Sequence, residues 1–559
     1  SRHAALRLLR QRGEPVKSAT FRPSDKVDFV VIGSGAAGGV MAKELSTAGF
    51  KVVVLEQGPY LRNKDFVHDE IKGFFQGQLL NDWKRQPNTF RRTDSDKAAR
   101  QPAVLYGRVV GGGTVHFTGN FWRFKELDFR ERTHYGAVPG ADLQDWPISY
   151  AELEPYYTKV EQEFGVSGFS GAPFDPPRSK PYPLPPLPVK SSGVLFERAT
   201  KKLGLHPYPA PMAILSKPYR GRPACVQCSF CKGYGCEVGA KSSSLATVIP
   251  AAEKTGRCEI RSESYVRKIE IDCQGRVTGA VYFDSQRKEV FQKACAVIVC
   301  ANGAETPRLL LMSKSNRFPD GLANTNGVVG KYFLGDTGVL MHALFEHPLN
   351  DYRGVHVSRL IHDYYESGFC GGAGIDARFD QHPIGFALWG LPKEVPRWGD
   401  GFKNALAQYF THTMSLLAHT TCLAVESNSI SLDPDVKDAW GLPAVRMTFK
   451  NHPDDLKVMG FSADRMREIL EVAGARKIWG GGVGDLSFSA HLMGTCRMGN
   501  DAKTSVVDKY HRTHDVPNLF LVDGSSFVTS ARQQPTMTIA ALAYRAADYI
   551  ARSARRGEI

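Results

Sequence analysis

The segment from residue 27 to residue 56 limits the fold of this chain more than any other part of the sequence. A short apolar, β-branched run at 27–33 (VDFVVIG) precedes a glycine-rich turn, a helical stretch at 36–48 and a second apolar run at 51–56. A strand, a helix and a strand in so short a length predict a right-handed β-α-β crossover. We therefore expect an α/β fold that is built on parallel strands.

The turn has the glycine pattern of dinucleotide-binding proteins, Gly33-Ser-Gly35-Ala-Ala-Gly38. The first glycine allows a tight turn, the second lets a pyrophosphate approach the backbone, and the third lets the helix pack closely on the strand. The helix N-terminus offers amide donors to the phosphates, and Glu56, at the end of the next strand, accepts hydrogen bonds from a ribose diol. The alternative is a purely structural glycine turn. The motif does not distinguish FAD from NAD.

Composition excludes several classes of protein. The chain has 559 residues, 42% of them apolar, which is enough for a large core and more than one domain. Its longest apolar runs, such as 295–301 and 539–543, are far shorter than a membrane span, and the N-terminus lacks the apolar core of a signal peptide. The net charge of +14 is dispersed except near the two ends, whereas nucleic-acid binding needs a focused basic patch. We expect no transmembrane segment and no nucleic-acid partner.

The remaining sequence predicts further segments. Residues 171–191 are so rich in proline that they exclude a helix or a central strand, and we interpret them as an extended connector. From about 346 to 480 the pattern changes to mixed strands and helices. The other predictions are a tail at 1–25, a covering loop at 60–105, strands within 259–272, 278–283, 296–301 and 518–523, and helices at 453–475 and 536–552.

Four more motifs determine what the first domain binds. They are 107–114 (GRVVGGGT), 303–310 (GAETPRLL), 491–499 (HLMGTCRMG) and 534–538 (QPTMT). Together and in this order they resemble the glucose–methanol–choline (GMC) oxidoreductases, from about residue 27 to the C-terminus. In one place the chain departs from the family: Ser313-Lys314 stands where the family often has Ser-Gly, at the end of a loop.

The resemblance implies an α/β fold with a Rossmann-like FAD-binding domain and an inserted α+β substrate-binding domain. It predicts an FAD-binding domain at 26–345, which contains the connector and a cysteine loop at 221–240. The substrate-binding domain is expected at 346–485. A return to the FAD-binding domain, with the catalytic segment, is expected at 486–559.

The same resemblance assigns the chemistry. Oxidation of an alcohol by a flavin needs a base within hydrogen-bond reach of the hydroxyl, and a neutral imidazole suits this task near pH 7. His491 occupies the family's catalytic histidine position, although a buried, hydrogen-bonded histidine is the alternative role. Gln534 stands where the family has Asn or His, and its amide is able to donate to the substrate oxygen. Arg532 and Gln533 are alternative candidates for that contact.

The resemblance also predicts contacts with the cofactor. Arg108, Gly112, Asp523, Gly524 and Thr536 match positions at the flavin or its phosphates in relatives. Two roles are open for His116. Some relatives place a histidine at this spacing and bond it covalently to the 8α-methyl group of the flavin, and otherwise the ring packs beside the flavin.

A second strong signal is the cluster Cys225, Cys228, Cys231 and Cys236. Four thiolates in twelve residues are able to converge on one centre, and the first three spacings match a bacterial iron–sulfur run, although the fourth is one residue longer and no proline follows. Tetrahedral zinc, free thiols and disulfides are the alternatives. The segment resembles the cysteine-bearing segment of bacterial FAD-dependent sugar dehydrogenases, which implies an iron–sulfur cluster of the 3Fe-4S or 4Fe-4S type.

These features predict a dehydrogenase that oxidises a hydroxyl of a sugar, glycoside or polyol. A cluster removes electrons one at a time towards another redox protein, and the resemblance implies that the partners are a small subunit and a cytochrome, or another electron acceptor. An oxygen-using alcohol or sterol oxidase with structural cysteines is the alternative, and a non-catalytic subunit with a vestigial flavin site is a third. The sequence leaves the compartment open between the periplasm, reached with a signal-bearing partner, and the cytoplasm.

The substrate contacts are expected within or near 346–480. The tryptophan and tyrosine content is compatible with stacking on a sugar. Candidates for the pocket lining are His342, His347, Trp389, Trp398 and His412, and a packed or surface position is the favoured alternative for each.

Overall fold

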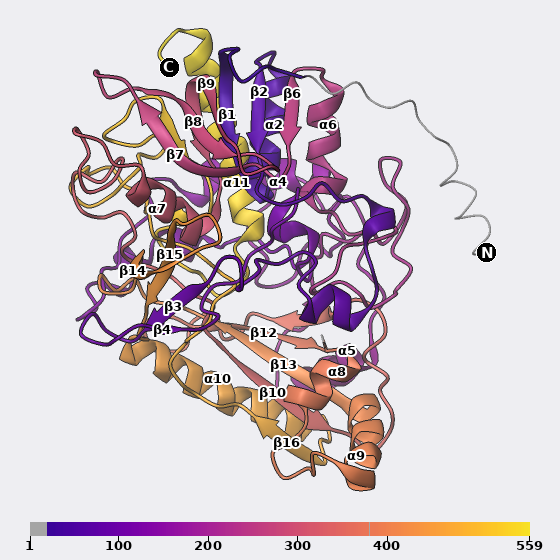
Figure 1. The fold of residues 1–559 in the computed structure, drawn as a ribbon. Helices are drawn as coiled ribbons and strands as arrows, with labels where there is room; N and C mark the ends of the chain where they lie inside the picture. The colour runs from indigo at the N-terminus through magenta and orange to yellow at the C-terminus, as the bar shows by residue number, and fades with distance from the viewer. Residues whose placement is uncertain (1–19, 380) are drawn as a thin grey trace.

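The computed structural model describes residues 20–379 and 381–559. It has two parts (Figure 1): a parallel sheet flanked by helices in the upper half, and an antiparallel sheet with one long helix beneath it in the lower half. Of the predicted tail at 1–25, residues 1–19 lie outside the described residues. The α/β fold with a Rossmann-like unit is confirmed.

The upper sheet has seven strands in the order β6-β2-β1-β9-β8-β7, and β17 lies beside β9. The strands that belong to the parallel part are β1 (Val27–Ile32), β2 (Val52–Leu55), β6 (Cys258–Arg261), β9 (Glu289–Val299) and β17 (Leu519–Leu521). An antiparallel extension consists of β7 (Tyr265–Ile271) and β8 (Val277–Phe283). The strands β1 and β2 are mostly apolar and almost entirely buried, as expected for a parallel sheet that is covered on both faces.

Helices pack around this sheet and on one another. The helix that follows the glycine turn, α2 (Ala36–Thr47), contacts both α6 (Val248–Lys254) and the C-terminal helix α11 (Thr536–Arg555). In turn, α11 contacts α4 (Tyr150–Phe164). The C-terminal helix therefore closes the same core as the first β-α-β unit, and its N-terminus lies beside the glycine turn.

The lower sheet has six antiparallel strands in the order β16-β10-β13-β12-β11-β5. Their bounds are β5 (Tyr208–Pro209), β10 (Gly338–Leu344), β11 (Val357–Ile361), β12 (Ala373–Arg378), β13 (Thr413–Thr420) and β16 (Lys477–Gly480). One face packs on α10 (Pro453–Val472) and α5 (Ser191–Lys202) through an apolar cluster. Two strands come from outside 346–485, because β5 and β10 pair with strands of the inserted segment.

Side chains alternate across this lower sheet, as the two-residue period of strands requires. On β12 and β13, Ile375, Ala377, Leu416 and Ala418 belong to the apolar cluster under the sheet. The residues between them point to the opposite face, toward the upper half of the molecule. That second face is polar and contains Asp376, Arg378, Ser415 and His419.

A third sheet of four strands corrects one prediction. Residues 60–105 were expected to be a covering loop, but β3 (Asn88–Arg91) pairs in parallel with β15 (Pro443–Thr448), and β4 (Ala99–Arg100) pairs with β3. The sheet is completed by β14 (Ser429–Lys437). The strand β3 is short, contains polar residues and pairs with a strand that lies far away in the sequence. Its residues therefore show no alternation of apolar and polar positions from which a strand could be predicted.

The other predicted elements agree with the structure. The helix expected at 453–475 is α10, the helix at 536–552 lies within α11, and the strand at 518–523 contains β17. Residues 171–190 contain neither helix nor strand. The further helices are α3 (Glu131–Tyr135), α7 (Asn302–Met312), α8 (Pro383–Gly385) and α9 (Gly399–His412). Among the described residues, no helix combines the length and the hydropathy that crossing a membrane requires.

Candidate active site

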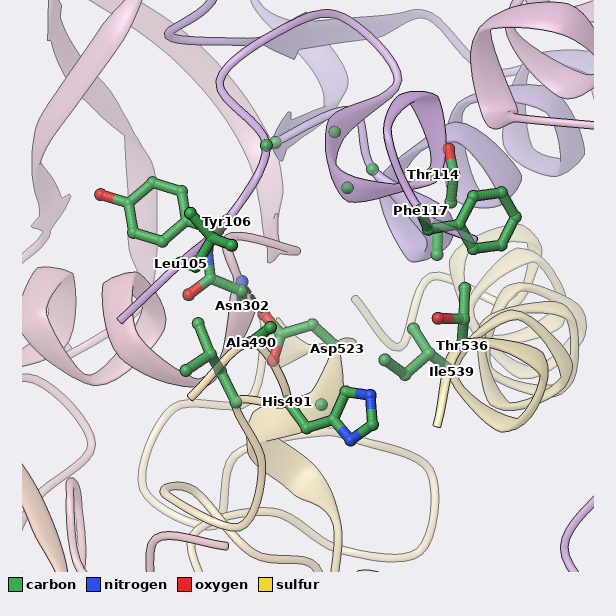
Figure 2. A pocket seen from close by; sticks show the side chains of 18 of the residues that line it. Leu105, Tyr106, Thr114, Phe117, Asn302, Ala490, His491, Asp523, Thr536 and Ile539 are labelled. Atoms are coloured by element: carbon green, nitrogen blue, oxygen red, sulfur yellow. Dashed lines mark hydrogen bonds between the residues drawn. The ribbon is translucent and has the colours of Figure 1, made fainter. Parts of the chain in front are cut away.

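One cavity of about 530 Å³ extends from the glycine turn to the polar face of the lower sheet. Its lining at the upper end includes Gly33, Gly35, Glu56, Gly112 and His116, and its lining near the middle includes Asp523, Gly524 and Thr536. At the lower end it is lined by His491, Gln534, Asp336, Leu340, Arg378, Leu417 and His419. Figure 2 shows the imidazole of His491 pointing into this cavity, toward the side where Thr536 and Ile539 lie. The cofactor motif and the catalytic motif thus share one space.

The glycine turn is held by backbone contacts that exclude a side chain. Gly33 has a φ of +93°, and a Cβ there would lie 2.5 Å from the carbonyl oxygen of Cys300, the residue that follows β9. A Cβ on Gly38 would lie 1.9 Å from the carbonyl oxygen of Gly33. By contrast, a Cβ on Gly35 would meet only Gly112 Cα, at 3.8 Å. Gly35 therefore has free space beside it, as a backbone approached by a pyrophosphate requires.

Glu56 is locked beside this turn. Its Oε2 accepts hydrogen bonds from the backbone N–H of Ser34 (3.0 Å) and from the Ser34 hydroxyl (2.7 Å), and its Oε1 accepts from the N–H of Gly58 (2.9 Å). Burial raises the pKa of Glu56, while the Ser34 and Gly58 hydrogen bonds oppose that rise. The carboxylate lines the cavity at the end of β2, which is the position expected for a ribose contact.

The second glycine loop brings His116 to the same cavity. Gly112 has a φ of +55° and packs on Gly35, so that a Cβ on Gly112 would lie 2.7 Å from Gly35 Cα. His116 follows this turn, and its Nε2 is buried with no hydrogen-bond partner among the described residues. Burial, with a smaller contribution from Lys241, lowers the pKa of His116 to about 4. The imidazole is therefore neutral and has one nitrogen available to a bound molecule.

The C-terminal segment supplies the middle of the cavity. Asp523 accepts hydrogen bonds from the N–H of Asn302 (3.1 Å) and the hydroxyl of Thr306 (2.6 Å), and burial raises its pKa. Thr536 lines the cavity as the first residue of α11, a twenty-residue helix. The N-terminus of a long helix favours a phosphate or another anion. Within the described part of the chain, Gly38 and Arg108 do not line the cavity.

His491 lies at the junction of the two halves. Its Nδ1 is 3.1 Å from Oδ1 of Asp336, which also lines the cavity. Burial lowers the pKa of His491, the Asp336 carboxylate raises it in part, and His419 and Arg378 lower it further. Asp336 was not found from the sequence, because its place beside His491 depends on the pairing of segments that are far apart in the chain.

Gln534 reaches the cavity, and its amide contacts a residue that sequence analysis missed. The Gln534 Nε2 position is 2.6 Å from Nε2 of His419, and both side chains line the cavity. His419 Nε2 is also 3.0 Å from Oδ2 of Asp376 and 3.1 Å from Nη2 of Arg378. These residues could have been predicted to share one face of a sheet from the alternation of apolar and polar positions in 373–378 (AGIDAR) and 413–420 (TMSLLAHT).

The residues proposed as alternatives to Gln534 do not reach the substrate side. Arg532 is fully buried, donates to Asp128 Oδ1 (2.9 Å) and also pairs with Glu131. The Gln533 amide donates to the backbone carbonyl of Arg123. Neither side chain lines the cavity, so both serve to hold the segment that carries Gln534.

The histidines and tryptophans considered for the pocket lining take the favoured alternative and lie away from the cavity. His342, His347, Trp389, Trp398 and His412 do not line the cavity, as judged from the described residues. His342 lies on the polar face of β10 but bonds Ser415 Oγ through Nδ1 (2.7 Å). Trp398 is 85% exposed. Residue type alone selected these positions, whereas the register of the sheet decides which side chains face the cavity.

The cysteine loop lies next to the cavity but is not arranged as a metal centre. Its thiols are free, and among residues 20–379 and 381–559 no group of three or more His, Cys, Asp or Glu side chains is placed to hold a metal ion. Burial raises the pKa of Cys225 to about 11 and that of Cys231 to about 12. In this arrangement the four sulfur atoms are therefore not gathered around one point.

The loop is nevertheless tied to the flavin side of the cavity. The N–H of Gly233 donates to the carbonyl oxygen of His116 (2.7 Å). The buried ammonium group of Lys241 donates to the carbonyl oxygens of Phe117 (3.0 Å) and Cys231 (2.7 Å). One hydrogen bond therefore joins the cysteine loop directly to the backbone of His116.

Taken together, the β-α-β unit, the glycine contacts and the cavity that joins them to a histidine define a dinucleotide-dependent redox enzyme. Comparisons with known proteins agree with this class. Residues 31–91 match the model of an NAD(P)-binding Rossmann-like domain, and residues 190–333 and 424–543 match two models of GMC oxidoreductase.

Two relatives are similar over almost their whole length. A 2-methyl-1,2-propanediol dehydrogenase of Mycolicibacterium austroafricanum is 36% identical, over 95% of this chain and 96% of its own. A gluconate 2-dehydrogenase flavoprotein of Pantoea cypripedii is 32% identical, over 96% of this chain and 95% of its own. The crystal structure of an Aspergillus oryzae formate oxidase has the same fold, with a TM-score of 0.67, 14% identity, and coverage of 96% of this chain and 100% of that one.

The chain belongs to the GMC oxidoreductase family. It is an FAD-dependent oxidoreductase that acts on CH–OH groups. Its own residues fit that cofactor, because Gly35 leaves room for the pyrophosphate, Glu56 is placed for a ribose, and His116, whose Nε2 has no partner among the described residues, lines the same cavity.

The glycine contacts lead to a prediction about cofactor binding. Gly38→Ala should force the turn apart, lower the free energy of unfolding by about 1–3 kcal/mol and reduce the FAD content of the purified protein. Gly460→Ala is the control, because Gly460 lies inside α10 with no atom within 4 Å of an added Cβ. That substitution should keep full FAD content and stabilise the protein by about 0.5–1 kcal/mol. Visible flavin absorbance per protein and thermal unfolding measure both variants, and equal FAD content in the two would contradict the packing role of Gly38.

Proposed function

We propose that the protein oxidises a hydroxyl group of a polyol, sugar or glycoside, with His491 as the base. The observation that carries this proposal is the single cavity in which the dinucleotide turn, His491 and Gln534 meet. An alcohol that enters from the lower sheet reaches His491 on its way to the cofactor end. The relatives named for a diol and for gluconate support a polyhydroxylated substrate.

Asp336 fixes the direction in which His491 moves a proton. A carboxylate 3.1 Å from Nδ1 favours the tautomer that carries its proton on Nδ1. The other ring nitrogen, Nε2, is then unprotonated and is able to take the proton of a substrate hydroxyl. Bound FAD would accept the hydride that leaves the carbon atom bearing this hydroxyl group. Gln534 is placed to hold the substrate oxygen while the proton leaves.

We propose that His116 forms a covalent bond with the flavin. Its Nε2 is buried and without a partner among the described residues, and the residue lines the cavity beside the Gly112 turn. Burial lowers the pKa of the ring, which leaves this nitrogen able to form a bond to carbon. Such a bond would replace a C–H bond of the flavin methyl group: the proton is lost, and the electron pair left on the flavin would be removed by the same acceptor that reoxidises it in turnover. The alternative is a histidine that only packs against the flavin.

We also propose that the cysteine loop assembles an iron–sulfur cluster when it is supplied with iron. The supporting observations are the four thiols, the N–H of Gln227 near Cys225 Sγ (3.4 Å), and the buried Lys241. Burial lowers the pKa of Lys241, and negative charge on the neighbouring cysteines raises it again, so an anionic centre stabilises the ammonium group. Assembly must bring the sulfurs together and displace their protons.

A cluster of this kind would pass electrons singly to another redox protein, which favours a dehydrogenase with partner subunits or a cytochrome. An oxidase that uses oxygen, with structural cysteines, is the second candidate, and burial that raises the pKa of the Cys231 thiol, as expected for a structural cysteine, favours it. Anaerobic turnover with ferricyanide and little formation of peroxide in air would support the dehydrogenase.

The assignment of the base leads to a prediction for His491 and Asp336. His491→Asn should keep FAD but slow flavin reduction by the alcohol about 10²- to 10⁴-fold. In the wild type, the lowered pKa of His491 keeps the base neutral to a pH below the ordinary value of about 6.5. Asp336→Asn removes a charge that raises this pKa, so the acid limb of the rate should move to still lower pH. Stopped-flow reduction measured across pH checks both, and unimpaired reduction in His491→Asn would show that another group is the base.

Acid precipitation checks the flavin bond. The yellow colour of the wild type should remain with the precipitated protein, and His116→Asn should release it into the supernatant, because Asn keeps a polar side chain but has no nucleophilic imidazole nitrogen. Colour that leaves the wild type completely would exclude the covalent bond.

Iron and sulfide analysis checks the cysteine loop. After anaerobic reconstitution, the protein should contain iron and acid-labile sulfide, and each replacement of Cys225, Cys228, Cys231 or Cys236 by Ser should lower both without lowering FAD. Cys273→Ser is the matched control, because Cys273 is exposed and lies outside the loop. Reconstituted wild type without iron would leave the oxidase with structural cysteines as the better description.

A further inference from the structure

The amide of Gln534 is held by a side chain from the opposite half of the molecule. Gln534 follows the fully buried Arg532 in the segment that leads into α11, whereas His419 belongs to β13 of the lower sheet. Their nearest nitrogen positions are 2.6 Å apart, and both side chains are more than 90% buried. The other end of the amide has no hydrogen-bond partner among the described residues, and Gln534 lines the cavity. One end of the amide is thus anchored, and the other end, also buried, is left without a partner in the described part of the chain.

His419 is itself anchored from behind. Asp376 and Arg378 lie on β12, on the same face as His419, since Gly374 of β12 pairs with His419 in the sheet register. Asp376 is fully buried, accepts from Arg378 Nε (2.6 Å) and lies 3.0 Å from His419 Nε2. The chain of contacts runs from the strand backbone through Asp376 and His419 to Gln534.

The charge on Asp376 decides which way these groups are oriented. Burial by itself would raise the pKa of Asp376, but Arg378 and His419 outweigh burial and hold the pKa below its ordinary value. An ionised carboxylate makes a stronger hydrogen bond with a donor than a neutral acceptor does, so the His419 proton belongs on Nε2. The single Nε2 proton of His419 is within reach of both Asp376 Oδ2 (3.0 Å) and the Gln534 amide (2.6 Å), so the two acceptors share it in a three-centre hydrogen bond. Because this nitrogen carries a proton, the Gln534 atom that faces it is the carbonyl oxygen, and the NH₂ group lies at the other end of the amide.

We infer that His419, oriented by Asp376, is a positioning residue that presents the NH₂ group of Gln534 to the substrate oxygen. The inference rests on the proposed function of the cavity. It gives the lower sheet a role in the reaction, which is to orient the amide of the motif residue Gln534. It also explains how a glutamine, one methylene longer than asparagine, is fixed in place at this position.

Single variants test the inference through flavin reduction at saturating substrate. His419→Leu should slow the reduction about tenfold, the loss expected when one supporting hydrogen bond is removed, with unchanged FAD content. His419→Gln keeps an N–H near the Nε2 position and should restore most of the rate. His342→Leu is the matched control, since His342 lies on the same sheet face but off the cavity, and it should react like the wild type. If His419→Leu fails to fold, His419→Asn, which is too short to reach Gln534, takes its place.

A double-mutant cycle identifies the route of the effect. If His419 acts through Gln534, the variant with both His419→Leu and Gln534→Ala should be no slower than Gln534→Ala alone. Independent, multiplying effects would overturn the inference, as would a wild-type rate in His419→Leu. Failure of the proposed function has a different signature: His491→Asn would then reduce its flavin as fast as the wild type.

Discussion

The active site depends on the close approach of backbone segments that only glycine allows. The first glycine turn packs on the end of β9 and on the second glycine loop, and added Cβ atoms at Gly33, Gly38 and Gly112 would lie 1.9–2.7 Å from backbone atoms. Glu56, held by Ser34 and Gly58, and His116 line the cavity beside these backbone contacts. The C-terminal segment and the lower sheet supply further parts of the lining.

The lower sheet performs two tasks because its two faces differ. Its apolar face packs on α10 and α5 and stabilises the inserted part of the chain. Its polar face points toward the cavity and carries Arg378 and His419 in hydrogen bonds that lock their side chains. A strand register that shifted by one residue would exchange the two faces. The core under the sheet therefore also fixes the polar groups that line the cavity.

The local pattern of the sequence predicted what local interactions form. The β-α-β unit, its glycine turn and Glu56 follow from a short segment, and the helices α10 and α11 follow from long periodic stretches. The motifs also selected His491 and Gln534, and both residues line the cavity. Contacts that depend on strands meeting across the chain were not accessible in the same way. Asp336 is the clearest case, because its position beside His491 follows from tertiary packing and not from any spacing in the sequence.

The cavity contains two imidazole–carboxylate pairs, and their surroundings assign them different tasks. Asp336, beside His491, lies partly open to the cavity, whereas Asp376, beside His419, is fully buried and paired with Arg378. A pair that exchanges a proton with a substrate must be reachable, and its charge must be able to change. Asp376 and Arg378 instead form a fixed, buried ion pair, in which a change of charge is costly. His491 is therefore suited to move the proton, and His419 to hold still the group that binds the oxygen.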